Sequence, residues 1–84
     1  MKIYMISTPH CPRCEAALKT LQSSVDSSIL EDTDRFEKLV FPNDNQAVEI
    51  AQRLKIQQAP VFAIEESGDY KPVELKEVIE LLNS

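Results

Sequence analysis

The chain has 84 residues, of which 43% are apolar, 9 are basic and 14 are acidic, so its formal net charge is −5. This length supports one small domain over residues 1–84 with a modest core, which excludes a two-domain enzyme and a large enclosed substrate cavity. The acidic balance and the scattered lysines and arginines argue against a nucleic-acid partner, and no apolar run approaches the roughly 20 residues that span a membrane.

The first part of the chain predicts a strand followed by a helix. Residues 2–7 are mostly apolar or aromatic and predict a short strand, buried on both faces, at the centre of a sheet. Between residues 12 and 24, apolar side chains recur at helical spacing among strong helix formers, which predicts the first helix. For residues 25–35, a loop, an extra turn of helix and a strand stay open as alternatives.

A second strand and a second helix follow in the middle of the chain. Residues 36–41, Phe-Glu-Lys-Leu-Val-Phe, predict the strand, and residues 42–45 end it in a turn that also supplies helix-capping side chains. Apolar residues on one face of residues 46–56 predict the helix, which packs on the sheet. The first strand, the first helix and this second strand then form a parallel crossover unit.

The last part of the chain predicts a β-hairpin and a closing helix. Strands at residues 61–64 and 70–73 flank a turn at residues 66–69. Pro72 confines the second arm to a sheet edge, because proline lacks the N–H that a central strand must donate. Helical spacing over residues 73–82 predicts the last helix. The order of elements therefore predicts an α/β domain with a four-stranded mixed sheet and three helices (βαβαββα).

Two cysteines stand where the first strand gives way to the first helix. Cys11 falls at the helix N-terminus, where unpaired backbone N–H groups and the helix dipole favour the thiolate, which is the form that attacks a disulfide. Pro12 suits the first helical position because it lacks an N–H, and Arg13 adds a cation beside the sulfurs. Cys14 comes one turn later and more deeply, so it is placed to resolve a mixed disulfide formed at Cys11.

The same cysteine spacing occurs in metal sites, which leaves a second class of function open. A zinc site normally takes four protein ligands, whereas this chain offers only Cys11, Cys14 and the single His10, which argues against a metal site within one molecule. The alternative is a metal or iron–sulfur binding module that uses the same cysteines across a dimer. The N-terminus lacks a secretory signal, so we expect a cytoplasmic protein, in which a close cysteine pair indicates catalysis or metal binding.

The stretch Thr8-Pro9-His10-Cys11-Pro12-Arg13-Cys14, placed after the first strand, resembles the active-site stretch of glutaredoxins in the thioredoxin-fold family. Gln58-Ala59-Pro60-Val61 is similar to the segment in which that family carries a cis-proline beside its cysteines. With the order of elements, the resemblance covers nearly the whole chain. It implies a thioredoxin fold and a thiol–disulfide oxidoreductase that works by dithiol exchange. It also implies that Pro60 is cis and that the Ala59 backbone aligns the substrate, which we further expect to contact Pro12 and Arg13.

The chain departs from the glutaredoxins at positions that hold glutathione. Glutaredoxins usually have Thr-Val-Pro at the cis-proline, a Gly-Gly pair after the hairpin and a lysine before the cysteines; this chain has Gln58-Ala59-Pro60, Lys71-Pro72-Val73-Glu74 and Ser7-Thr8 there. Arg13, Arg53 and Gln57 either replace those contacts or are simply exposed polar side chains. We therefore expect an electron carrier to disulfide-containing protein substrates or to glutathione mixed disulfides, with glutathione or thioredoxin reductase as the reductant. We also expect a monomer with no tightly bound cofactor.

Other polar residues have a simpler interpretation. His10 either tunes the neighbouring thiolate or, more simply, is solvated. Tyr4 lies on a predicted strand and is expected in the core. The acidic residues at 31–34, at 65–66 and at position 69 lack the spacing of a calcium loop or of paired catalytic carboxylates and are expected on solvated faces.

Overall fold

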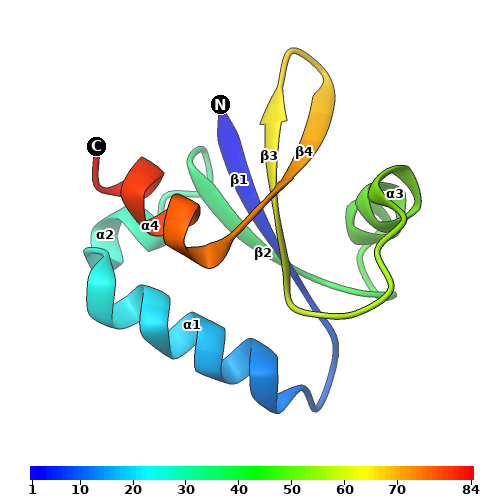
Figure 1. Ribbon diagram of the computed structural model, residues 1–84, viewed down its shortest axis with the longest axis horizontal. Helices are drawn as coiled ribbons and strands as arrows, with labels where there is room; N and C mark the ends of the chain where they lie inside the picture. The colour runs from blue at the N-terminus through cyan, green and yellow to red at the C-terminus, as the bar shows by residue number, and fades with distance from the viewer.

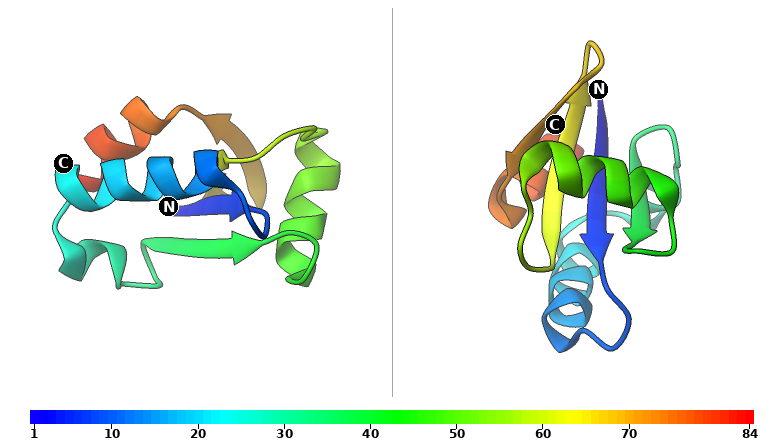
Figure 2. Two further views of the ribbon diagram at one scale, coloured as in Figure 1. Left: turned by 90° about the horizontal axis from the view of Figure 1, so that it is seen from below. Right: turned by 90° about the vertical axis from the view of Figure 1, so that its right-hand side faces the viewer.

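The computed structural model describes residues 1–84 as a four-stranded sheet with helices on both faces (Figure 1 and Figure 2). In chain order the elements are β1 Lys2–Ser7, α1 Pro12–Ser24, α2 Ser27–Leu30, β2 Phe36–Val40, α3 Asn45–Leu54, β3 Val61–Glu66, β4 Asp69–Val73 and α4 Leu75–Leu82. The predicted α/β class and mixed four-stranded sheet are confirmed. None of the helices is long and apolar enough to cross a membrane.

The strands lie in the order β2-β1-β3-β4. β1 is parallel to β2 and antiparallel to β3, and β3 is antiparallel to β4. The central position predicted for the first strand is confirmed, and every residue from Ile3 to Ser7 is buried. β4 is an edge strand, as Pro72 predicts. Proline has no N–H to donate, and at a sheet edge no further strand needs that hydrogen bond.

Helices α1 and α4 cover one face of the sheet, and α3 covers the other (Figure 2). The first face buries the larger apolar cluster: Ile3, Met5, Cys14, Ala17, Leu21, Val25, Phe36, Phe62, Ile64, Val78 and Leu82. The second face buries a smaller one: Tyr4, Ile6, Leu39, Ala47, Ile50 and Ala63. One of the two cysteines, Cys14, is therefore part of the larger core.

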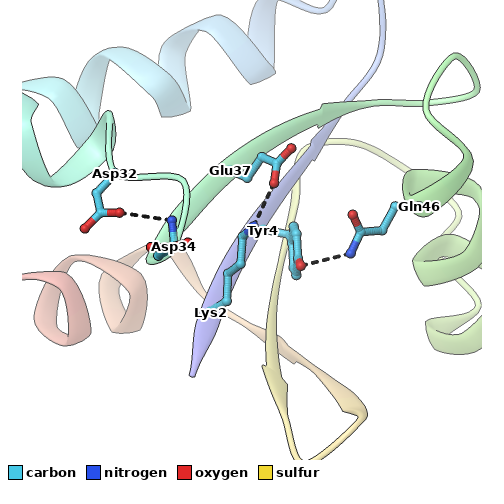
Figure 3. A network of polar contacts seen from close by, with 6 residues as sticks. All are labelled: Lys2, Tyr4, Asp32, Asp34, Glu37 and Gln46. Carbon is cyan, nitrogen blue, oxygen red and sulfur yellow. Dashed lines mark hydrogen bonds and ion pairs between the residues drawn. The ribbon is translucent and has the colours of Figure 1, made fainter.

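Polar contacts tie β1 to β2 and to α3 (Figure 3). Lys2 Nζ donates a hydrogen bond to Glu37 Oε1 over 2.8 Å, and Gln46 Nε2 donates to the Tyr4 hydroxyl over 2.9 Å. The hydrogen bond to Glu37 raises the pKa of Lys2 above its ordinary value. Tyr4 is buried, as expected, and the Gln46 amide satisfies its hydroxyl inside the core.

The structure has four helices, so the prediction of three was wrong. The additional helix is α2, a single turn within the segment that the sequence left open. Asp26 caps it, because Asp26 Oδ1 accepts the backbone N–H and the hydroxyl of Ser28, each over 2.8 Å. These two hydrogen bonds lower the pKa of Asp26. After α2, Asp32 Oδ1 accepts the N–H of Asp34 over 3.0 Å and turns the chain toward β2 (Figure 3).

Several predicted boundaries shift by one or two residues. The second strand ends before residue 41, where the Asp44 side chain accepts the Val40 N–H over 2.8 Å and the chain turns. The helix predicted over 46–56 begins one residue earlier and ends two residues earlier, because Lys55 adopts a left-handed conformation with φ 55°. The strand predicted over 61–64 is two residues longer. The last helix begins two residues later than predicted, because Val73 still belongs to β4.

Candidate functional site: a cysteine pair at the start of α1

Cys11 is the N-cap residue of α1, and Pro12 is in the first helical turn, as predicted. Cys11 has the extended conformation typical of an N-cap, with φ −109° and ψ 101°. Its Sγ accepts the backbone N–H of Cys14 over 3.1 Å, so the sulfur takes the place of a capping oxygen. The two cysteines form a disulfide with their Cα atoms 5.2 Å apart.

The two cysteines differ in depth. Cys14 is 5% exposed and packs within the larger core, whereas Cys11 is half-buried at its edge. This is the arrangement predicted from the helical position of Cys14, one turn inside the helix. Cys11 is therefore the more accessible cysteine of the pair.

A hollow opens beside the cysteine pair, on the side facing β2. Its lining residues come from the loop before α1, the first two turns of α1 and strand β2: Ser7, Thr8, Pro9, His10, Cys11, Cys14, Glu15, Leu18, Lys38 and Val40. The sequence did not single out Lys38, which lies in a predicted strand. The alternation of side chains along a strand could have placed Lys38, because residues 36, 38 and 40 share one face. Phe36 belongs to the core under α1, so Lys38 is on the side of the sheet that α1 covers.

The Ala59–Pro60 peptide bond is cis, as the resemblance implied. Thr8 lines both the hollow beside the cysteines and a second, apolar hollow that Ala59 also lines. A third hollow is lined by Pro60 and by Ala17 of α1. The loop between α3 and β3 thus reaches the same edge of the molecule as the start of α1 (Figure 2). A second cis bond, Phe41–Pro42, follows β2 and was not foreseen, because the sequence around it indicated only a turn.

The candidate replacements for the missing glutathione contacts separate in the structure. Arg13 is exposed in the first turn of α1, between the two cysteines. Gln57 is exposed and lines the apolar hollow with Ala59 and with Thr8, the residue that this hollow shares with the one beside the cysteines. Arg53 is held elsewhere, because its guanidinium donates to the Gly68 carbonyl over 3.2 Å in the β3–β4 hairpin.

The remaining polar residues near the pair give no metal site. His10 is exposed, with φ 57°, and lines the same hollow as the cysteines. No group of three or more His, Cys, Asp or Glu side chains is placed to hold a metal ion. A cluster bound at Cys11 and Cys14 would need ligands from outside this chain.

Comparison with known proteins identifies the fold. No family model matches the sequence, and no curated protein matches it. Among solved structures, the chain is similar to a thioredoxin from Thermus thermophilus, with a TM-score of 0.54 and 20% sequence identity, over 96% of this chain and 69% of that one. The chain therefore has a thioredoxin-like fold, which confirms the fold predicted from the cysteine stretch and the order of elements.

Proposed function

We propose that the chain is a glutaredoxin-like thiol–disulfide oxidoreductase, one thioredoxin-fold domain over residues 1–84 that exchanges two electrons with disulfides. The observation that carries this proposal is the disulfide at the start of α1, with Cys11 at the N-cap beside an open hollow and Cys14 in the core. The Ala59–Pro60 loop at the same edge supports it, because an extended substrate backbone can align there.

The reduced protein begins the exchange at Cys11. Its thiolate attacks one sulfur of the substrate disulfide, so that a bond forms between Cys11 Sγ and that sulfur while the substrate S–S bond breaks. The other substrate sulfur leaves as a thiolate and takes a proton from solvent. The N–H groups of the first turn of α1 favour the attacking thiolate, and the Cys14 N–H already points at Cys11 Sγ over 3.1 Å.

Cys14 completes the exchange. Its thiol gives up a proton, its sulfur attacks Cys11 Sγ, and the remaining substrate sulfur leaves as a thiolate. Two electrons have then passed from the protein to the substrate, and the protein carries the Cys11–Cys14 disulfide seen here. Recharging takes two electrons, either from two glutathione thiols or from NADPH through thioredoxin reductase. We propose a disulfide-containing protein as substrate and a monomer in the cytoplasm as the working form.

The experiment compares two ways of reducing the oxidised protein. The oxidised protein is offered glutathione with glutathione reductase and, separately, thioredoxin reductase, and NADPH consumption is followed in both. Fast reduction by glutathione assigns glutaredoxin activity and gives Gln57 and Arg13 a role as replacement contacts. Preference for thioredoxin reductase assigns a thioredoxin-like electron donor and fits the absent Gly-Gly pair. If neither system reduces the protein, or if Cys11→Ser keeps the wild-type rate, the proposal is wrong.

Preparation of the protein tests the alternative. A brown colour and a mass of two chains in the purified protein would favour an iron–sulfur module shared between two copies. A colourless monomer that turns over disulfides supports the oxidoreductase.

A further inference from the structure

A groove runs from the cysteine pair along α1 and β2 to α2. Its first part is the hollow beside the cysteines, and its second part is lined by Leu18, Gln22, Ser27, Leu30, Glu31, Thr33, Phe36, Glu37 and Lys38. Leu18 and Lys38 line both parts, so the two hollows meet between these side chains. The lining residues come from α1, α2, β2 and the loops before α1 and β2, and Figure 2 shows α2 between the end of α1 and the start of β2. We call this the α1–β2 groove.

The edge strand β2 directs part of its backbone away from the sheet. At one end of its ladder with β1, Ile3 N–H donates to the Arg35 carbonyl over 2.9 Å, and at the other end Phe41 N–H donates to the Ser7 carbonyl over 2.7 Å. In a parallel strand, the N–H and C=O groups of alternate residues point to opposite sides of the strand. The odd-numbered residues of β2 therefore bond to β1, and the even-numbered ones direct their N–H and C=O outward.

Both ends of this outward edge are already occupied. The Phe36 N–H donates to the Asp32 carbonyl over 2.9 Å. The Val40 N–H donates to Asp44 Oδ2 over 2.8 Å, and the Val40 carbonyl accepts the Asp44 N–H over 2.8 Å. The peptide groups of Lys38 remain between these two turns, on the outer edge of β2, while Lys38 itself lines both parts of the groove. An open edge of this kind pairs with an extended chain, and its shortness prevents sheet-to-sheet association.

The dimensions of the α1–β2 groove fit a short extended segment. From Cys14 to Gln22, α1 advances eight residues, which is about 12 Å at 1.5 Å per residue. An extended chain covers this length with about four residues at 3.3 Å each. The groove therefore has room for a few residues of a polypeptide on one side of its cysteine, while the sulfur of that cysteine meets Cys11.

The charges along the groove indicate which kinds of side chain such a segment should carry. Glu15 lies at the cysteine end and Glu31 at the α2 end, and neither carboxylate has an ion-pair partner. Glu37 is neutralised by Lys2 over 2.8 Å. Lys38 and the half-buried Leu18 line both parts and so stand in the middle. Cationic side chains are therefore favoured at both ends of the occupant, and an uncharged or acidic one in the middle.

We propose that the α1–β2 groove binds an extended segment of about four residues from the polypeptide substrate, next to its reacting cysteine, with basic side chains at its two ends. The backbone of this segment pairs with the peptide groups of Lys38. The proposal rests on the proposed oxidoreductase function and adds a specificity to it. It also places a binding surface on the β2 side of the cysteines, away from the Ala59–Pro60 loop.

Two synthetic disulfide peptides test the charge preference. They are identical except at the two ends of the segment next to the cysteine, where one peptide carries lysines and the other carries glutamates. The full-length protein is used, and dithiothreitol reduces it again after each turnover. We expect a higher kcat/KM for the lysine peptide, a preference that falls as salt is added. Glu31→Lys, which is remote from the sulfurs, should reduce the preference about two- to fivefold, the effect of one exposed ion pair. Glu66→Lys changes the net charge equally in the β3–β4 hairpin and should leave the preference unchanged.

A backbone variant tests the pairing at Lys38. Lys38→Pro removes an N–H that points out of the sheet, where proline is tolerated, and Lys38→Ala is the matched control for loss of the side chain. We expect Lys38→Pro to have a kcat/KM for the lysine peptide about two- to tenfold below that of Lys38→Ala, the effect of one hydrogen bond. If circular dichroism shows that Lys38→Pro is unfolded, the Glu31→Lys comparison decides.

A small symmetrical disulfide without a peptide separates the two ways of failing. If the wild-type protein does not reduce this compound, the proposed function is wrong. If it reduces the compound but treats the two peptides alike, or if Glu31→Lys and Glu66→Lys behave alike, only the groove proposal is overturned.

Discussion

Replacement of Ile50 by alanine measures how strongly α3 is held on the sheet. Ile50 is 0% exposed and lies in the smaller core, to which α3 is the only contributing helix. Ile50→Ala removes three buried carbons at about 0.8 kcal/mol each, or about 2.4 kcal/mol, and the cavity left behind raises the loss to about 3–4 kcal/mol. A domain of this length has a free energy of unfolding of about 4–13 kcal/mol, so the loss is a large part of the total.

Urea unfolding of the oxidised protein, followed by far-ultraviolet circular dichroism, gives this free energy directly. The matched control is Ile79→Ala on α4, the same chemical change at a half-buried position, for which we expect a loss of about 1–1.5 kcal/mol. Both variants should keep the wild-type m-value. An Ile50→Ala loss equal to or below that of Ile79→Ala would refute the assignment of Ile50 to a tightly packed core.

Three further predictions follow from individual contacts. In the reduced protein Cys11 should be alkylated by iodoacetamide much faster than Cys14, as mass spectrometry of the peptides would show; equal rates would contradict the difference in depth. Cys14→Ser should accumulate a mixed disulfide with a substrate peptide, and Cys11→Ser should not, as non-reducing electrophoresis would show. Lys2→Gln should destabilise the fold by less than about 1 kcal/mol at neutral pH. The pKa of Lys2 is raised in the folded state. The stability difference between wild type and Lys2→Gln should therefore be full at pH values below the pKa of Lys2 in the unfolded chain and disappear as the pH rises through its pKa in the folded protein. A stability difference that grows with pH would contradict this.

The sequence predicted the elements whose signal is local and repeated. α1 has the predicted bounds because helical spacing continues over 13 residues and Pro12 fixes its start. β1 was placed at the centre because its side chains are apolar on both faces. The position of Cys11 at a helix N-terminus, and of Cys14 one turn deeper, follows from these two elements alone.

The parts that the sequence did not predict depend on contacts between distant residues. α2 is one turn long, so it has no periodicity of its own and depends on the Asp26 cap and on packing against the larger core. The charged residue Lys38 lies beside the cysteines only because β2 pairs with β1 in the observed register. The separation of Arg53 from the site likewise depends on the hairpin, where the Gly68 carbonyl accepts its hydrogen bond.

The unequal faces of the sheet explain how a short chain holds this site. On the α3 side the ends of the strands carry polar residues: Lys2 pairs with Glu65, and Glu65 pairs with Tyr70. Because this part of the face is polar, one helix suffices to cover the six-residue core. On the other side two helices enclose eleven buried residues, and Cys14 is one of them. The larger core thus holds the Cys14 side chain in place, because a side chain packed on all sides keeps one position. Cys11, one turn earlier at the edge of that core, stays partly exposed while its N-cap position is fixed by the same helix.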